Sequence, residues 1–341
     1  MTSVAVIGAS GTTGGEILRI LLNHPRVSKV QAISRSLAGK SIAAAHPHLR
    51  EYSHVGFINP DDVARCDVVF FSLPHGSSSI EHSLWKNFAP LVIDLSSDFR
   101  MKDPKATDQY YGRTHELPSK LEDFVPGIPE YFRSEFKSAK RIAVPGCAAL
   151  ASILAIKPLT DRGLIGPVVF IDAKVGTSGL DRRAIGSGLY AEKAGVSGKF
   201  MPYEHHHEVD VAAICKARVY INTSNTDAGR GTFIAAYSEL SSYLTDVELR
   251  TIYEGTYGKE PFTRIVKNTD EANKLPDAKQ LFGTNYCDVG FATTRDHKCI
   301  IAFAALDNLI KGSAGNAVHC MNISLGYDEH AGLNMKSLQL A

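Results

Sequence analysis

The stretch Val4-Ala5-Val6-Ile7-Gly8-Ala9-Ser10-Gly11-Thr12-Thr13-Gly14 decides how the first part of the chain folds. An apolar run that ends at a glycine predicts a buried strand, and the apolar residues of segment 15–22 recur at helical spacing. Glycines at G-x-x-G-x-x-G spacing between a strand and a helix let the backbone approach a pyrophosphate at the helix N-terminus. A plain tight turn is the alternative, but the position directly after the first strand favours a dinucleotide site. The predicted contacts are Gly8, Ser10, Gly11, Thr12, Thr13 and Gly14.

Strand-like and helix-like segments alternate through the first 150 residues, a pattern typical of parallel β-α-β units. The strands predicted there are residues 4–7, 30–33, 67–73 and 91–95. From about residue 165 the strands lengthen and few helices separate them, which indicates an α+β domain with a mixed sheet. Those strands are residues 167–173, 218–222, 231–238, 286–293 and 299–306, whereas residues 255–285 are expected to form a long surface excursion.

We therefore predict an α/β protein of two domains, which agrees with a length of 341 residues at about 150 residues per domain. Residues 1–147 are expected to form a Rossmann-type domain with a parallel sheet, completed by the C-terminal helix 312–341. Residues 148–311 are expected to form the α+β domain with the mixed sheet.

Composition argues against several classes of protein. The 37 basic and 36 acidic residues leave a net charge of +1, which does not suit a nucleic-acid binder that relies on bulk charge. The most apolar internal stretch, residues 148–156, is far shorter than the about twenty residues that span a bilayer. Six cysteines without a C-x-x-C pair fit a reduced compartment better than a disulfide scaffold or a zinc ribbon. We expect a cytoplasmic protein with no membrane or nucleic-acid partner.

The end of the second strand carries Ser34-Arg35-Ser36, which bears on the choice of dinucleotide. Sites for NAD usually place a carboxylate here to bind the ribose 2′-hydroxyl, and a carboxylate would repel a 2′-phosphate. An arginine and two hydroxyls would bind that phosphate, although exposed loop arginines are also common. Ser34, Arg35 and Ser36 therefore predict NADP(H) as the cofactor.

Cys147 is the candidate nucleophile. It follows Val144-Pro145-Gly146 and precedes the apolar helix 148–156, which we expect Pro158 to limit. A thiol at a helix N-terminus meets the positive end of the helix dipole and has a lowered pKa, and the Pro-Gly turn can present it to a cleft. Burial as a packing residue is the alternative for Cys147. It is the preferred interpretation of the other cysteines, which are Cys66, Cys215, Cys287, Cys299 and Cys320.

Three consecutive histidines, His205-His206-His207, stand among carboxylates. Three interpretations compete: a metal site, a solvated polar loop, and a general acid/base brought near Cys147. Consecutive side chains point in different directions, which counts against a metal site. In an extended segment, His205 and His207 would share a face and His206 would point away. The spacing alone does not choose between these interpretations.

Together these motifs resemble the N-acetyl-γ-glutamyl-phosphate reductases, a family related to aspartate-semialdehyde dehydrogenase. The resemblance runs nearly from end to end. Its motifs are the glycine turn, Ser34-Arg35-Ser36, Leu73-Pro74-His75-Gly76, Asp94-Leu95-Ser96-Ser97-Asp98-Phe99-Arg100, Pro145-Gly146-Cys147, Asp172-Ala173-Lys174-Val175-Gly176-Thr177-Ser178-Gly179, the three histidines, Gly283-Thr284-Asn285 and Asp307-Asn308-Leu309-Ile310-Lys311-Gly312-Ser313-Ala314-Gly315. It implies an NADP-dependent enzyme that reduces an acyl phosphate to an aldehyde, with a second domain for catalysis and for assembly into a homodimer or homotetramer.

The resemblance also implies roles for single residues. Cys147 matches the nucleophile that forms a thioester, and His205, His207 and Asp210 occupy the three places of the family's histidine motif. We expect His207, rather than His205, to stabilise the thiolate and to protonate the oxyanion. No metal is expected. The further implied contacts are Pro74, Asn308 and Asn316 for the cofactor and Arg100, Ser178, Gly179 and Arg182 for a substrate carboxylate or phosphate. The sequence departs from the family pattern at His206, Val209, Asp210 and Asn316, where arginine, proline, glutamate and glutamine are usual.

A narrower resemblance is to the branch that acts on substrates tethered to a small acidic amino-group carrier protein. It rests on motifs such as His46-Pro47-His48-Leu49-Arg50 and Gly326-Tyr327-Asp328-Glu329. In that branch the blocked acid is glutamate, 2-aminoadipate or both, in arginine or lysine biosynthesis. An acidic carrier would need a local basic rim, which a net charge of +1 neither shows nor excludes. The rival interpretations are an aspartate-semialdehyde-type dehydrogenase, a non-catalytic NADP-binding sensor and a metal-binding protein.

Overall fold

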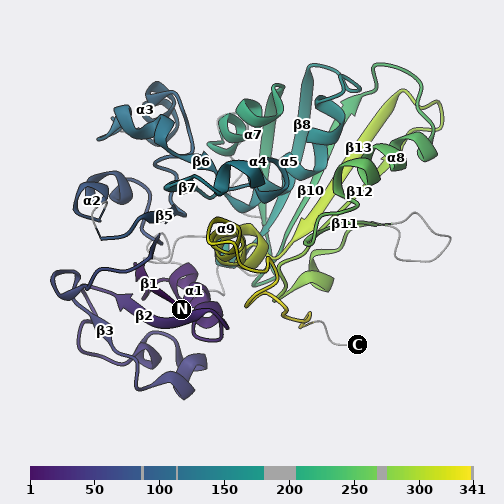
Figure 1. Cartoon of the computed structure of the whole chain (residues 1–341). Helices are drawn as coiled ribbons and strands as arrows, with labels where there is room; N and C mark the ends of the chain where they lie inside the picture. Colours follow the sequence, from purple (N-terminus) through teal and green to yellow (C-terminus); the bar gives the residue numbers. More distant parts are fainter. Residues whose placement is uncertain (86–87, 113, 180–204, 267–274, 339–341) are drawn as a thin grey trace. The chain divides into compact units, whose positions relative to one another are not determined.

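The computed structural model describes residues 1–85, 88–112, 114–179, 205–266 and 275–338 (Figure 1). The chain divides into two compact units. Unit 1 consists of Met1–Pro145 and Ser313–Met335, and unit 2 consists of Gly146–Gly312 and the terminal residues from Lys336 on. We expected residues 312–341 to complete the first domain, but Leu338 donates its backbone N–H to Phe282 O inside unit 2. No helix of the described residues is long and apolar enough to cross a membrane.

Unit 1 is built on a parallel sheet with strand order β3-β2-β1-β4-β5-β7-β6. The strands are β1 Thr2–Ile7, β2 Val27–Ile33, β3 Phe57–Ile58, β4 Val68–Phe71, β5 Leu91–Asp94, β6 Val125–Pro126 and β7 Arg141–Ala143. The helices are α1 Thr12–Leu21, α2 Ser77–Trp85, α3 Pro104–Tyr111, α4 Pro129–Phe136 and α9 Gly315–Ser324. Every residue of the central strand β4 is buried, as expected where helices cover both faces of a parallel sheet. The strand order reverses between β1 and β4, and sheets of this kind bind ligands at such a reversal, outside the carboxyl ends of the strands.

Unit 2 is built on a mixed sheet with strand order β11-β12-β13-β10-β8-β9. The strands are β8 Val168–Gly176, β9 Arg218–Thr226, β10 Thr232–Glu239, β11 Thr263–Ile265, β12 Cys287–Thr293 and β13 Cys299–Leu306, and the helices are α5 Cys147–Thr160, α7 His207–Cys215 and α8 Asp246–Tyr257. Side chains alternate along β8, so Val169 and Ile171 are buried whereas Phe170 is 51% exposed. Helix α5 packs on the buried face of β10 and β13 (Figure 1).

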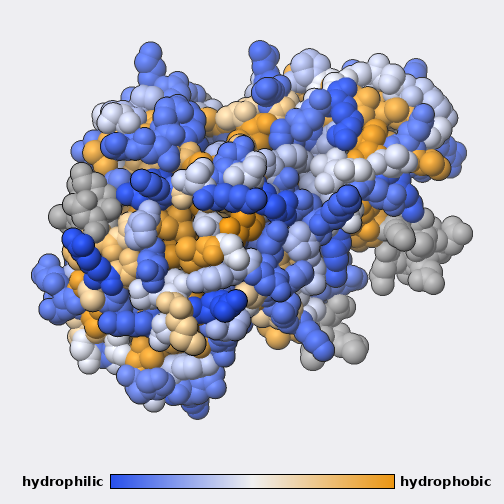
Figure 2. All heavy atoms as spheres, viewed as in Figure 1, coloured by the Kyte–Doolittle hydropathy of each residue, from blue (hydrophilic) through white to orange (hydrophobic). Residues whose placement is uncertain are grey.

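The opposite face of the unit 2 sheet carries exposed aromatic side chains. Phe170 lies opposite Tyr237, which is 45% exposed, and its ring stacks on Tyr220 at a centroid distance of 5.5 Å. On the side of the molecule seen in Figure 2, hydrophobic side chains are interspersed with hydrophilic ones. An exposed aromatic cluster on an open sheet face is typical of a surface that contacts another protein.

Helix α5 continues through Pro158 to Thr160, so the prediction that Pro158 limits it is wrong. Proline has no N–H to donate to the carbonyl four residues earlier, which is that of Leu154. The hydroxyl of Tyr257 donates to Leu154 O at 2.8 Å, and the hydroxyl of Tyr253 donates to Ala155 O at 2.6 Å. Tyr257 of α8 therefore supplies the hydrogen bond to Leu154 O that Pro158 cannot, and Tyr253 bonds to the neighbouring carbonyl.

The predicted fold class, a parallel Rossmann-type sheet with a second mixed-sheet domain, is confirmed. The expected surface excursion at residues 255–285 is wrong in part, because Tyr257, Phe262 and Leu281 are buried and β11 lies within it. The expectation that Cys299 is buried is also wrong, since it is exposed at the start of β13. The other four cysteines that we expected to be packing residues are buried.

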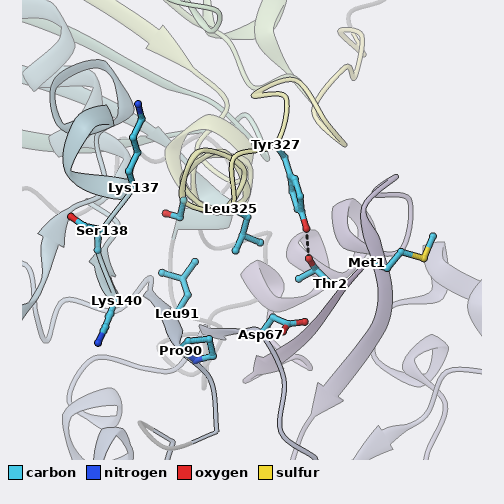
Figure 3. A pocket seen from close by; sticks show the side chains of 12 residues that line it. Met1, Thr2, Asp67, Pro90, Leu91, Lys137, Ser138, Lys140, Leu325 and Tyr327 are labelled. Atoms are coloured by element: carbon cyan, nitrogen blue, oxygen red, sulfur yellow. Dashed lines mark hydrogen bonds between the residues drawn. The ribbon is translucent and has the colours of Figure 1, made fainter.

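A cavity of about 440 Å³ lies at the N-terminal edge of the unit 1 sheet (Figure 3). Thr2, Asp67 and Leu91 line it from the beginnings of β1, β4 and β5, and the hydroxyls of Thr2 and Tyr327 are 2.5 Å apart at its border. This edge is opposite to the carboxyl ends of the strands, where the glycine turn lies. The cavity is therefore separate from the candidate site.

Candidate active site

The glycine turn connects β1 to α1 in unit 1. Gly8 has a φ of +80°, and a Cβ atom there would lie 2.1 Å from Ser72 O, so only glycine fits. A Cβ at Gly14 would lie 2.4 Å from Gly8 O, which keeps the turn tight against the helix. No described side chain caps the first turn of α1. Its N–H groups and dipole therefore suit an anion such as a pyrophosphate.

Three serine hydroxyls meet beside this turn. Ser34 Oγ donates to Ser10 Oγ at 3.0 Å and lies 3.4 Å from Ser36 Oγ. Arg35 is two-thirds exposed, and its Nη2 lies 2.8 Å from a carboxylate oxygen of Glu81 on α2. The hydroxyls and the guanidinium suit a 2′-phosphate. In this structure Arg35 pairs with the carboxylate of Glu81, which is negatively charged as a phosphate is. Sequence reasoning missed Glu81, because nothing in its spacing links α2 to the end of β2.

Two further predicted cofactor contacts lie in unit 1. Pro74 follows β4, and its carbonyl accepts the N–H of Ser77 at 3.1 Å. Asn316 is fully buried in α9, where its Nδ2 donates to Gly127 O at 2.7 Å. Its Oδ1 has no hydrogen-bond partner among the described residues. A buried acceptor without a donor fits the carboxamide N–H of a nicotinamide ring.

Asn308 lies in unit 2 and links two backbone segments there. Its Nδ2 donates to Ser178 Oγ at 3.0 Å, and its Oδ1 accepts the N–H of Gly231 at 2.7 Å. The amide thereby holds the 3-10 turn Thr177–Gly179, which contains the predicted substrate contacts Ser178 and Gly179. The predicted contact of Asn308 with the cofactor stays a prediction.

Cys147 is the first residue of α5, after Gly146 at the N-cap. The thiol is partly exposed and lies at the positive end of the helix dipole, which favours a thiolate. Two glycines fit tightly around it. A Cβ at Gly312 would lie 2.5 Å from Cys147 Cβ, and a Cβ at Gly146 would lie 2.1 Å from His207 Nε2. The ring of His207 is thus packed against the residue that precedes the cysteine.

The three histidines form a compact cluster and not an extended segment. His206 has α-helical φ and ψ at the N-cap of α7, which begins at His207, and the ring centroids lie 4.2–4.6 Å apart. The condition for a shared face of His205 and His207, an extended segment, is therefore not met. His207 donates its backbone N–H to His205 Nδ1 at 3.2 Å, so the proton of neutral His205 is on Nε2. Burial lowers the pKa of His205 to about 4, and its imidazole is neutral at pH 7.

These contacts separate the roles of the cluster. His205 supports the backbone of His207 as a neutral acceptor, whereas the His207 ring packs against Gly146, the residue before Cys147. The ring nitrogens of the three histidines all lie within 4.8 Å of one another, which is close enough for a chelate. A metal at His205 would have to displace either its Nε2 proton or the hydrogen bond to Nδ1, because neutral imidazole has one lone pair. Nearby, Glu208 Oε1 accepts the N–H of Ile221 at 2.8 Å, and Asp210 is buried in the first turn of α7.

Arg100 and Arg182 are the arginines predicted to contact the substrate. Arg100 donates from Nε to Val144 O at 2.7 Å and from Nη2 to Leu95 O at 2.6 Å, both within unit 1. It therefore fixes the backbone at the end of β5 and just before the Pro145-Gly146-Cys147 turn. Arg182 lies outside the described residues. Contact of either arginine with a substrate stays a prediction.

Comparison with known proteins identifies the class. Residues 3–139 match the model of the semialdehyde dehydrogenase NAD binding domain, and residues 147–308 match that of the semialdehyde dehydrogenase dimerisation domain. Among solved structures, aspartate semialdehyde dehydrogenase II from Vibrio cholerae shares the fold, with a TM-score of 0.68 at 18% identity over 96% of this chain and 99% of that one. An aspartate semialdehyde dehydrogenase from Candida albicans, solved with NADP, has a TM-score of 0.63 at 14% identity over 95% of this chain and 98% of that one. The chain belongs to the semialdehyde dehydrogenase family.

Curated relatives narrow the assignment. A LysW-L-2-aminoadipate 6-phosphate reductase from Deinococcus radiodurans is 33% identical over 98% of this chain and 97% of that protein. A protein from Thermomicrobium roseum, provisionally named for the same activity, is 39% identical over 99% of both chains. The resemblance to the phosphate reductases and their carrier-protein branch is thus confirmed. The chain is an NAD(P)-dependent oxidoreductase of the phosphorylating type, which confirms the predicted enzyme class and a nicotinamide dinucleotide as cofactor. The choice of NADP stays a prediction.

Proposed function

We propose that this enzyme reduces 2-aminoadipyl or glutamyl phosphate, attached to a small acidic amino-group carrier protein, to the semialdehyde, with oxidation of NADPH and release of phosphate. The observation that carries the chemistry is the packing of the His207 ring against Gly146, directly before a cysteine at a helix N-terminus. The substrate is supported by relatives whose names specify LysW-linked aminoadipate or glutamate phosphates, at 33–39% identity over nearly the whole chain.

Cys147 and His207 carry the first half of the reaction. The thiol transfers its proton to His207, and Sγ attacks the acyl carbon of the substrate. The bond from that carbon to the phosphate oxygen breaks, phosphate leaves, and a thioester remains on Cys147. The α5 dipole stabilises the thiolate before the attack, because the partial positive charge of a helix N-terminus lies beside Sγ.

In the second half, bound NADPH supplies the hydride that reduces the thioester carbon. His207, now protonated, donates to the developing oxyanion, which stabilises the charge on the thiohemiacetal. The thiohemiacetal hydroxyl returns this proton to His207 as the carbon–sulfur bond breaks, so that the aldehyde leaves and Cys147 is regenerated as the thiolate. His205, with a pKa of about 4, is not a proton donor at neutral pH and holds the backbone of His207 instead.

We also infer where the other predicted residues act. In this proposal the Ser178-Gly179 turn, which Asn308 holds, donates hydrogen bonds to the substrate's carboxylate or phosphate, and Arg100 and Arg182 supply positive charge for the same groups. The exposed aromatic face of β8, β9 and β10 is the surface on which a second copy of the chain would pack, because the family's domain at residues 147–308 is a dimerisation domain. A homodimer or a homotetramer would result.

The test compares substrates at saturating NADPH. Rates of NADPH oxidation and phosphate release are measured with four substrates: carrier-linked 2-aminoadipyl phosphate, carrier-linked glutamyl phosphate, N-acetylglutamyl phosphate and aspartyl phosphate. We expect kcat/KM for a carrier-linked substrate to exceed that for N-acetylglutamyl phosphate by at least about 100-fold, because the carrier adds binding contacts remote from the reacting carbon. Equal values would refute the proposal that the substrate is linked to a carrier protein. A preference for aspartyl phosphate would indicate instead that the enzyme forms aspartate semialdehyde. Cys147→Ala serves as the blank.

A further inference from the structure

His46 lies directly behind the glycine turn in unit 1. It is 4% exposed and stands between the 3-10 turns Ile42–Ala44 and Pro47–Tyr52. Its backbone N–H donates to Ile42 O at 2.9 Å. Because Pro47 follows, His46 itself stays outside the helical region, with a φ of −128° and a ψ of 76°. The backbone that carries the imidazole is thus held on both sides.

The imidazole of His46 forms a hydrogen bond with the glycine turn. Its Nε2 lies 2.8 Å from Ala9 O, the carbonyl that follows Gly8. A carbonyl oxygen only accepts, so Nε2 carries the proton and donates. Ala9 N–H in turn donates to Ile33 O at the end of β2. Both backbone polar groups of Ala9 are therefore fixed, one by β2 and the other by His46.

Gly15 directly follows the G-x-x-G-x-x-G pattern, and the pattern itself does not require a glycine at this position. A Cβ atom at Gly15 would lie 2.5, 2.6 and 3.1 Å from three atoms of the His46 ring. The missing side chain in the first turn of α1 is what admits the imidazole. One ring thus packs against α1 and bonds to the turn that precedes it.

We propose that His46 is a positioning residue for the dinucleotide: through Ala9 O and the space at Gly15 it holds the glycine turn in the conformation that binds the pyrophosphate of NADPH. Loss of the donor would release the Ala9 carbonyl and let the turn move relative to α1. The N–H groups at the start of α1 would then no longer be aimed in advance at the phosphates. The expected consequence is weaker cofactor binding, with little change in the chemical steps.

The experiment measures the Kd of NADPH by fluorescence titration, and kcat at saturating NADPH, for the full-length protein and four variants. His46→Leu removes the donor and keeps an apolar side chain, whereas His46→Gln keeps an N–H donor of similar reach. Gly15→Ala keeps His46 but pushes its ring away. His48→Leu, at an exposed histidine whose ring lies 5.9 Å from that of His46, is the matched control.

We expect His46→Leu and Gly15→Ala to raise the Kd of NADPH about tenfold, with kcat within about twofold of wild type. His46→Gln should restore the Kd to within about threefold, and His48→Leu should bind as wild type does. Wild-type affinity in His46→Leu or in Gly15→Ala would overturn the inference, as would equal losses in His46→Leu and His46→Gln. If His46→Leu does not fold, Gly15→Ala and His46→Gln decide.

This inference rests on the cofactor site of the proposed function, and the titration separates the two. Failure of the wild-type chain to bind NADPH would refute both. Normal binding by the wild type together with normal binding by His46→Leu would refute the role of His46 and leave the reductase untouched.

Discussion

Replacing Gly146 by alanine would test the position of the acid/base directly. The new Cβ would lie 2.1 Å from His207 Nε2 and under 3.0 Å from two carbons of the same ring. An ordinary van der Waals contact begins at 3.4 Å, so the imidazole would have to retreat by about 1.3 Å. A displacement of about 1 Å at a reacting group costs about 100-fold in rate. We therefore expect kcat to fall about 100-fold, which is about 2.7 kcal/mol of activation free energy.

The assay measures kcat with the acyl phosphate at saturating NADPH, the Kd of NADPH, and the rate at which iodoacetamide alkylates Cys147 as a function of pH. The Kd should not change, because the glycine turn belongs to unit 1. Gly255→Ala is the control within unit 2. A Cβ at Gly255 meets nothing within 4 Å, so kcat should stay at the wild-type value. The exposed helix should gain about 0.5–1 kcal/mol of stability.

Two results would refute this reasoning. One is a Gly146→Ala enzyme whose kcat stays within about threefold of wild type, because His207 would then not act from the place in which the structure holds it. The other is a loss of kcat that Gly255→Ala shares, which would point to a general response of unit 2.

Arg35→Glu should raise the Kd of NADPH at least about tenfold and leave that of NADH nearly unchanged, because a carboxylate repels the 2′-phosphate; parallel titrations check this, and equal shifts would contradict it. Tyr257→Phe should lower the free energy of unfolding by about 1–3 kcal/mol, since it strips the hydrogen bond from Leu154 O, which Pro158 cannot replace; a change below about 0.5 kcal/mol in chemical denaturation would count against it. Burial, then the nearby carboxylate charge, raises the pKa of Asp94 from 3.8 to about 7, so the folded protein keeps a proton there that the unfolded chain loses above about pH 4. The contribution of Asp94 to stability therefore falls as pH rises from about 4 to 7. The free energy of unfolding of Asp94→Asn, relative to that of wild type, should rise by on the order of 4 kcal/mol between pH 4 and 8. A difference between the two denaturation curves that does not depend on pH would contradict this.

Local signals were enough to predict the fold class of the first domain and four of the strands in its sheet. The glycine turn, the strands of the parallel sheet and Ser34-Arg35-Ser36 are each encoded in a few adjacent residues. The structure brings Ser10 to Ser34, as that prediction requires. The short strands β3, β6 and β7 were missed, because two or three residues carry too little periodicity to be recognised.

Contacts between distant segments account for what the sequence did not reveal. Pro158 leaves Leu154 O without its helical donor, and Tyr257, about a hundred residues away, donates to that carbonyl instead. The histidine cluster was recognised, but its helical N-cap geometry was not, since three identical residues give no periodicity. His46 appeared in a motif and Gly15 directly follows the glycine turn, yet only the fold shows that the imidazole of His46 packs where a Gly15 side chain would lie.

The central claim is that Cys147 forms an acyl intermediate, and a single turnover without NADPH tests it most directly. The enzyme is mixed with excess carrier-linked 2-aminoadipyl phosphate, and the phosphate released in the first seconds is measured. The reaction is then quenched at low pH, and the masses of the tryptic peptides are determined by mass spectrometry. We expect phosphate release stoichiometric with active sites and an aminoadipyl thioester on the Cys147 peptide, while the exposed Cys299 stays unmodified. Cys147→Ala should give neither. Phosphate release that requires NADPH, or that persists in Cys147→Ala, would contradict the mechanism.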